Sequence, residues 1–174
     1  MKNDLFLNDL CRIAQKAGAA IMPYFGQPID VERKADASPV TQADLAAHKA
    51  IVPALRELTP DIPIVSEEHK NHDLPEGTER FWLVDPLDGT KSFIRGESEF
   101  TVNIGLIEHG TPTLGIIYIP VEKMMYVGKV GQGAYRQKDG EEKETITTLT
   151  TADSPSSGGV RVVIVSFSSP SFWR

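Results

Sequence analysis

The spacing of the β-type segments in the middle of the chain constrains the fold more than any other sequence feature. Runs of β-branched and other apolar residues occupy positions 101–107, 113–119 and 124–129. Turn-forming residues separate them, HGTP at 109–112 and PVEK at 120–123. These connections are too short to contain crossover helices, so the three strands should form an antiparallel meander.

Further segments extend this β-rich pattern. Apolar runs at 62–65 and 81–84 precede the meander, and another at 160–165 follows it. The charged segment 138–144 is typical of a solvated hairpin. The GQG sequence at 131–133 lacks the third glycine and the strand-to-helix setting of a dinucleotide-binding motif, so we interpret it as a turn between strands.

The N-terminal part of the chain shows helical periodicity. Between residues 4 and 24, apolar side chains recur at steps of three and four and form one stripe, which consists of Phe6, Leu10, Ile13, Ala17 and Ile21. The pattern predicts an amphipathic helix. Cys11 lies at the edge of this stripe, where we interpret it as a packing residue rather than as a nucleophile.

A second helix should begin near Thr41. The sequence TQAD at 41–44 has the form of a capping box, and it precedes an apolar series at helical spacing, Leu45, Val52, Leu55 and Leu58. Pro53 falls inside this series. Because proline removes a backbone donor and clashes with the preceding turn, at a cost of about 3 kcal/mol, we expect a kink or a break there.

These segments together predict an α+β fold, in which two N-terminal helices pack on one face of a largely antiparallel sheet. The chain has 174 residues, 40% of them hydrophobic, which suffices for one domain, placed at residues 1–165. The net charge of −6 offers no basic surface to nucleic acid, and no apolar run approaches the roughly 20 residues that span a bilayer. An N-terminus without a signal-peptide pattern and a single cysteine favour the cytoplasm.

The chemistry is concentrated where the apolar run 81–84 ends in the sequence DPLDGT. Asp85 and Asp88 lie three residues apart, and a tight turn would point both carboxylates into one pocket. Their repulsion would be severe unless a hard cation lay between them, and Mg²⁺ favours such oxygen ligands. Asp-Pro and Asp-Gly are also among the commonest turn dipeptides, so a simple β-turn is the alternative interpretation.

The same sequence contains features of a phosphate site. Gly89 and Thr90 would offer backbone N–H groups at the opening of a short helix through residues 91–93. Lys91 and Arg95 could contact a second substrate phosphate, although exposed cations at the start of a helix are more often simply solvated.

A second apolar run, at 62–65, also leads to carboxylates, at Glu67 and Glu68. If the ends of the two strands converge, the carboxylates could hold two cations about 4 Å apart, which stabilise both the attacking water and the leaving oxygen of an in-line displacement. The alternative is a solvated pair of loop carboxylates. His69 and His72 follow, and the nearby Pro and Gly residues place them in a surface loop.

Three motifs resemble the inositol monophosphatase superfamily: SPVTQAD at 38–44, the glutamate pair at 67–68 and DPLDGT at 85–90. The resemblance runs from residue 1 to about residue 165. Within it, DGTKSF at 88–93 and EFTVNI at 99–104 look most like the CysQ branch, the 3'(2'),5'-bisphosphate nucleotidases. The resemblance implies the N-terminal domain of a sugar-phosphatase-like fold.

Carried over position by position, the resemblance implies that Glu67, Asp85 and the carbonyl of Leu87 hold one Mg²⁺. Asp85 and Asp88 would hold a second ion. Asp44 and Thr90, together with Glu67, would orient and deprotonate the attacking water, in line with general-base chemistry beside a cation. The expected substrate contacts come from Glu67, Leu87, Asp88, Gly89 and Thr90.

The substrate implied by the resemblance is adenosine 3',5'-bisphosphate, hydrolysed to AMP and phosphate during sulfate assimilation. An inositol or sugar phosphate is the alternative. By resemblance the enzyme is cytoplasmic, with peripheral attachment to the inner membrane as a further option.

The family's chains continue well beyond residue 174 with a C-terminal α/β domain, which supplies a Trp-Asp motif for the second metal and most of the leaving-group pocket. The tail at 166–174 departs from the family pattern, and the sequence therefore suggests a truncated or frameshifted product. We expect impaired turnover, or a non-catalytic fragment that binds Mg²⁺ and phosphate or regulates a full-length copy. The sheet edge exposed by the missing half would favour homo-oligomers.

Overall fold

The computed structural model describes five stretches of the chain: residues 2–26, 32–33, 39–40, 42–68 and 74–146. The expected strand at 160–165, the tail, the histidines at 69 and 72 and the capping residue at 41 lie outside these stretches. Along the described residues, no helix is long and apolar enough to cross a membrane.

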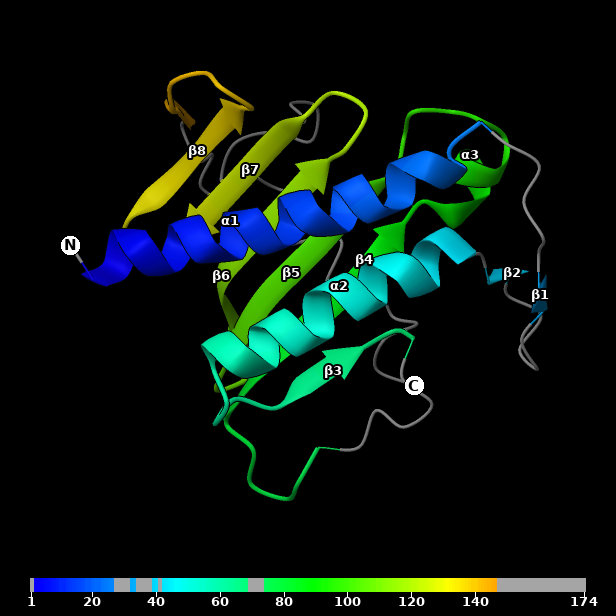
Figure 1. The fold of residues 1–174 in the computed structure, drawn as a ribbon. Coiled ribbons are helices and arrows are strands. Elements are labelled where there is room, and N and C mark those ends of the chain that lie inside the picture. Colours follow the sequence, from blue (N-terminus) through cyan, green and yellow to red (C-terminus); the bar gives the residue numbers. More distant parts are fainter. Residues whose placement is uncertain (1, 27–31, 34–38, 41, 69–73, 147–174) are drawn as a thin grey trace, which may run out of the picture.

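A seven-stranded sheet forms one layer of the structure (Figure 1). Its strands follow one another in chain order, and all neighbours are antiparallel except β3 and β4, which are parallel. The strands are β3 (Ile64–Ser66), β4 (Arg80–Asp88), β5 (Thr101–Glu108), β6 (Thr111–Ile119), β7 (Met124–Lys129), β8 (Gly133–Lys138) and β9 (Glu144–Ile146). The predicted meander is therefore confirmed, and the GQG turn and the charged hairpin connect β7 to β8 and β8 to β9.

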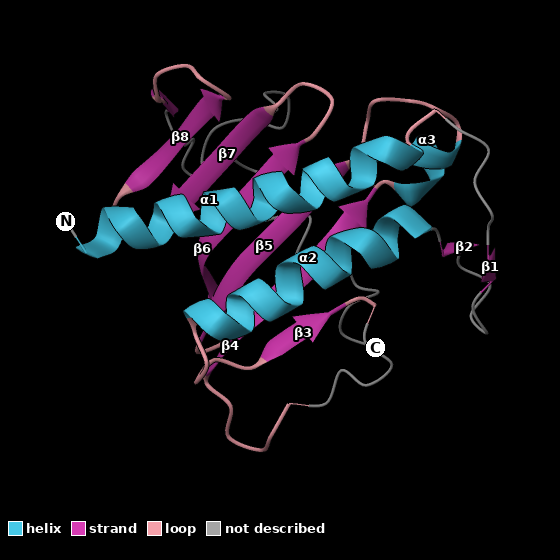
Figure 2. Cartoon of the chain, viewed as in Figure 1, coloured by secondary structure: helices cyan, strands magenta, loops and turns pink. Residues whose placement is uncertain are grey.

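Two long helices, α1 (Lys2–Ile21) and α2 (Gln42–Leu58), lie side by side on one face of this sheet (Figure 2). A short 3₁₀ helix, η1 (Met22–Tyr24), continues α1. A separate two-stranded sheet joins β1 (Glu32–Arg33) to β2 (Pro39–Val40), and a five-residue helix, α3 (Thr90–Ile94), follows β4. The α+β class with two helices on one face is as the sequence predicts.

The core lies between the helices and the sheet. α1 packs over β5 and β6, whereas α2 packs over β3 and β4. The fully buried side chains come from both layers and include Leu10, Ile21, Ile51, Leu55, Trp82, Ile104 and Ile116. Burying each such side chain contributes about 1.5–3 kcal/mol, so the interface between helices and sheet holds the layers together.

The register of α2 differs from the expectation in two respects. Leu45 is 37% exposed, whereas Val52 and Leu55 of the predicted series are buried, and Ala43, Ala47 and Ile51 complete the buried face. The small alanines let the helix lie close to the sheet, which a search for large apolar residues overlooks. Of the expected kink or break at Pro53, the break is wrong, because α2 is one continuous helix. Pro53 faces solvent, where water can satisfy the carbonyl that loses its partner.

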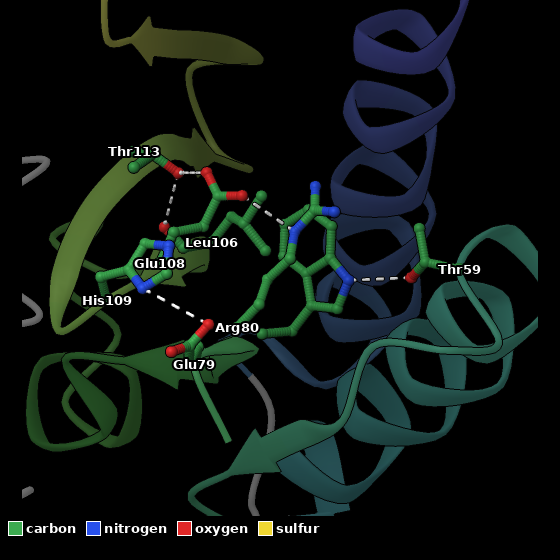
Figure 3. A network of polar contacts seen from close by, with 8 residues as sticks. Thr59, Glu79, Arg80, Leu106, Glu108, His109 and Thr113 are labelled. Atoms are coloured by element: carbon green, nitrogen blue, oxygen red, sulfur yellow. Dashed lines mark hydrogen bonds and ion pairs between the residues drawn. The ribbon is translucent and has the colours of Figure 1, made fainter. Parts of the chain in front are cut away.

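Near the start of β4, polar contacts join this strand to β5 and to the C-terminal end of α2 (Figure 3). Arg80 pairs with Glu108 across β4 and β5, with Nε and Oε1 3.0 Å apart. The indole Nε1 of Trp82 donates to Thr59 Oγ1 over 2.8 Å, which ties the end of α2 to β4. The Thr59 hydroxyl also donates to the carbonyl of Leu55 over 2.9 Å.

Candidate active site

The parallel strands β3 and β4 bring two of the predicted site residues to the same edge of the sheet. Ser66 pairs with Val84, and the backbone N–H of Glu67 donates to the Val84 carbonyl over 3.1 Å. Glu67 and Asp85 are therefore the next residues along two adjacent chains that run in the same direction. The expected convergence of the two strand ends is confirmed.

Asp85 and Asp88 lie in a bulge within β4, and not in a turn beyond it. Asp85 pairs with Asn103 and Asp88 with Thr101, so three steps along β4 oppose two steps along β5. Strand β4 thus continues to Asp88, and both the tight turn and the simple β-turn are corrected. The bulge accommodates Pro86, which has no N–H to donate to a sheet.

Hydrogen bonds hold the two aspartates of the bulge. The N–H of Leu87 donates to Asp85 Oδ1 over 3.2 Å. Asn103 Nδ2 donates to Asp88 Oδ2 over 3.2 Å, and the side-chain oxygen Oδ1 of Asn103 accepts from Thr101 Oγ1 over 3.1 Å. Asn103 is fully buried and was not predicted as a site residue. Its sequence signals are a single amide within a mostly apolar run and its place in the EFTVNI motif at 99–104.

Gly89 redirects the chain from the bulge into α3. Its φ of 86° lies in the left-handed region, and a Cβ at this position would be 2.5 Å from the carbonyl oxygen of Glu99. Only glycine fits both conditions without strain. Thr90 then begins α3, and its hydroxyl donates to the Leu87 carbonyl over 3.0 Å. Thr90 is thereby positioned directly beside the aspartates.

The electrostatics show that the predicted carboxylates gather around Asp85. The pKa of Asp85 is raised well above its ordinary value, first because the group is buried and then because Glu67, Asp88 and Asp44 lie nearby. The N–H of Leu87 opposes this shift. Asp44 is itself buried, at 6% exposure, in the first turn of α2. Three parts of the chain, α2, the end of β3 and the β4 bulge, thus contribute one acidic cluster.

This acidic cluster, formed by Asp44, Glu67, Asp85 and Asp88, has the donor chemistry that Mg²⁺ prefers. Along the described residues, no three Asp, Glu, His or Cys side chains are spaced to hold one ion. Mg²⁺ does not require three, because it commonly binds one or two carboxylates and completes its octahedron with waters and substrate phosphate. Two carboxylates together with the carbonyl of Leu87 are therefore a suitable set of ligands for one Mg²⁺ ion.

Two polar residues beside the cluster were also missed by the sequence analysis. His48 Nδ1 and Ser66 Oγ are 2.9 Å apart, within hydrogen-bond distance. His48 follows Asp44 by one helical turn, and Ser66 directly precedes Glu67. The spacing of four residues on a predicted helix could have indicated His48. The two cations that could contact a second phosphate, Lys91 in α3 and Arg95 directly after it, are both exposed, and Arg95 pairs with Glu97 at 3.9 Å.

Solved structures with the same fold define the class of protein. CysQ from Bacteroides thetaiotaomicron, a bacterial member of the inositol monophosphatase family, superposes with a TM-score of 0.66 at 35% identity and covers 92% of this chain and 68% of its own. The suhB protein of Bartonella henselae superposes with a TM-score of 0.68 at 32% identity, over 75% of this chain and 51% of its own. This α+β layered fold is that of the inositol monophosphatase family.

Sequence comparison gives the family directly. The inositol monophosphatase family matches residues 2–171, and the chain belongs to this family. The 3'(2'),5'-bisphosphate nucleotidase CysQ of Escherichia coli strain K12 is 49% identical over 141 residues, which is 79% of this chain and 57% of that protein. Its Haemophilus influenzae counterpart is 31% identical over 155 residues, 88% of this chain and 58% of that protein. The chain thus spans little more than half the length of these relatives, and the predicted resemblance is confirmed.

Proposed function

We propose that this chain carries the metal and phosphate site of a Mg²⁺-dependent phosphomonoesterase that acts on a bisphosphorylated nucleoside. The observation that carries the proposal is the acidic cluster, in which burial first, and then Glu67, Asp88 and Asp44, raise the pKa of Asp85. Such a cluster is costly unless cations neutralise it, which is a common property of phosphoryl-transfer sites. The likeness to relatives named as bisphosphate nucleotidases supports the same class of reaction.

Three residues would hold one ion and two would hold the other. Glu67, Asp85 and the Leu87 carbonyl form the first set, and Asp85 with Asp88 forms the second. When bound, such ions supply Lewis acidity and lower the pKa of water. The Mg²⁺ ions would thus supply the positive charge that balances the four carboxylates of the acidic cluster.

The protein's own groups would position the water and the phosphate. The hydroxyl of Thr90 donates to the Leu87 carbonyl, and its oxygen keeps lone pairs that would accept a hydrogen bond from one O–H of the attacking water. Asp44 would act as the general base that takes the other proton of that water. The N–H groups of Gly89 and Thr90 would bind phosphate oxygens, and the close packing of Gly89 against Glu99 fixes their direction.

The substrate we propose is adenosine 3',5'-bisphosphate, with AMP and phosphate as products, in a cytoplasmic role in sulfate assimilation. The support is the identity of 49–50% to proteins named for this activity. An inositol or sugar phosphate is the second candidate, supported by the inositol monophosphatase from Thermotoga maritima, which superposes with a TM-score of 0.67 at 30% identity. A fragment that binds Mg²⁺ and phosphate without turnover is the non-catalytic alternative.

Phosphate release with and without Mg²⁺ tests this proposal. The 174-residue chain and a version extended by the C-terminal part of the Escherichia coli relative are compared on adenosine 3',5'-bisphosphate and inositol 1-phosphate, with Asp85→Asn as the control. We expect Mg²⁺-dependent release from the bisphosphate that is strongest in the extended version. A preference for inositol 1-phosphate would show that an inositol phosphate, and not the bisphosphate, is the substrate. Phosphate release that is the same in Asp85→Asn as in the wild type would disprove the proposed metal site.

A further inference from the structure

A partly buried hydrogen bond joins the helix that carries Asp44 to the strand that leads into Glu67. His48 Nδ1 on α2 and Ser66 Oγ on β3 are 2.9 Å apart, and either group can donate. Ser66 is fully buried and His48 is half-buried. The bond connects α2 directly to β3, and the buried Ser66 hydroxyl is shielded from water at one end of it.

The bond lies next to two members of the acidic cluster. His48 follows Asp44 by four residues, so both side chains lie on the same face of α2. Ser66 is the last residue of β3, and the N–H of the next residue, Glu67, is bonded to the Val84 carbonyl over 3.1 Å. A change at this bond therefore alters the separation of the helix from the strand at the level of the carboxylates.

A comparable bond at the other end of α2 provides a reference. Trp82 Nε1 donates to Thr59 Oγ1 over 2.8 Å, and this contact also ties α2 to the sheet (Figure 3). Thr59 comes 15 residues after Asp44 in the sequence. At 1.5 Å per helical residue, it lies about 22 Å from Asp44 along the helix. Loss of this bond should weaken the packing of α2 without reaching the site.

We propose that His48 and Ser66 are a positioning pair that fixes the spacing between Asp44 on the helix and Glu67 and Asp85 on the sheet. Like charges at short distance repel, and α2 would otherwise relieve that repulsion by moving away from the sheet. The pair opposes this movement, so divalent cations meet carboxylates that are already in place. The inference rests on the proposed function, because it assumes that the cluster binds cations.

The experiment measures Mg²⁺ binding by the 174-residue chain, from the Mg²⁺ concentration at half-maximal thermal stabilisation. His48→Leu and Ser66→Ala should each raise this concentration by about 10-fold or more, as is usual when a group that orients metal ligands is lost. The double variant should be little worse than either single variant, because both remove one interaction. His48→Asn should restore much of the affinity, since its amide places a polar atom near the position of Nδ1.

The matched control is Thr59→Val, which removes the remote bond between α2 and the sheet. We expect it to lower the unfolding free energy in urea by about 1–3 kcal/mol, at least as much as Ser66→Ala because the bond to the Leu55 carbonyl is lost as well, with unchanged Mg²⁺ affinity. Equal effects of Thr59→Val and Ser66→Ala on Mg²⁺ affinity would overturn the positioning pair, as would unchanged affinity in His48→Leu. Absence of any Mg²⁺ response in the wild-type chain would overturn the proposed site as well, so the two failures are distinguishable.

Discussion

Asn103 of β5 donates a hydrogen bond to the carboxylate of Asp88 in β4, over 3.2 Å. The amide is fully buried, and its own oxygen accepts from Thr101. A side chain from the neighbouring strand thus sets the direction of one carboxylate of the acidic cluster. The bulge in β4 makes this possible. It places Asp88 opposite Thr101, whereas a regular antiparallel register from the Asp85–Asn103 pair would place Asp88 opposite Phe100.

We predict that Asn103→Leu weakens both stability and Mg²⁺ binding. The loss of a buried bond to a charged group should lower the unfolding free energy by about 1–3 kcal/mol in urea melts. Asn103→Asp keeps the size of the side chain but adds a negative charge next to Asp88. It should be less stable than Asn103→Leu in EDTA at pH 7, and the reverse order would contradict the charge argument.

Asp85→Asn should stabilise the metal-free chain. Burial and three neighbouring carboxylates raise the folded-state pKa of Asp85 above its unfolded-state value. The folded state therefore binds this proton more tightly, and stability is lost as pH rises from the unfolded pKa through the folded pKa. At pH 7 in EDTA, the variant should melt at a higher temperature than wild type.

The same variant should lose the response to Mg²⁺, because it removes a ligand shared by both proposed ions. Wild type at 100 times its dissociation constant should gain about 2.7 kcal/mol of stability. Thermal melts with and without Mg²⁺ measure both effects. A destabilised variant in EDTA, or one that Mg²⁺ still stabilises fully, would count against the acidic cluster.

Gly89→Ala should destabilise the protein more than Gly96→Ala. Both glycines have positive φ, 86° and 74°, so both substitutions pay about 1–2 kcal/mol for the left-handed conformation. A Cβ at Gly89 would also meet the Glu99 carbonyl at 2.5 Å, whereas a Cβ at Gly96 meets nothing within 4 Å. The difference between the two unfolding free energies in urea isolates this steric clash. Equal losses would show that the chain near Glu99 moves aside freely.

Cys11 should react slowly with iodoacetamide. Burial raises the pKa of its thiol, although a hydrogen bond from Tyr135 and the charge of Lys143 partly offset this effect. The thiolate is the reactive form, so alkylation at pH 8 should be slower than for a free cysteine and should accelerate at higher pH. Because this is the chain's single cysteine, intact mass reports it directly. Rapid labelling at pH 8 would contradict the burial of the thiol.

The sequence predicts those parts of the fold that depend on local patterns. The short turns at 109–112 and 120–123 fixed the meander, and the carboxylates after two apolar runs indicated the acidic edge. The bulge was not predicted because the sequence Asp85-Pro86 is equally compatible with a turn and with a β-bulge. Whether β4 continues depends on its pairing with β5, and that is a tertiary property.

The missed polar residues have the same explanation. Asn103 and His48 become meaningful only when β5 and α2 place them beside Asp88 and Ser66. Pro53 shows the converse, because its local effect predicts a break that the packing of Ile51 and Leu55 on the sheet overrides. Local chemistry therefore located the candidate site, and long-range packing determined which residues support it.

The parallel pairing of β3 with β4 has an evolutionary consequence. Backbone bonds between the strands, and not the chain that connects them, place Glu67 next to Asp85. The connection from residue 68 to residue 79 can therefore gain or lose residues while both carboxylates keep their positions. Among relatives, we expect insertions and deletions to accumulate in this connection, whereas the bulge at residues 85–88 should tolerate none.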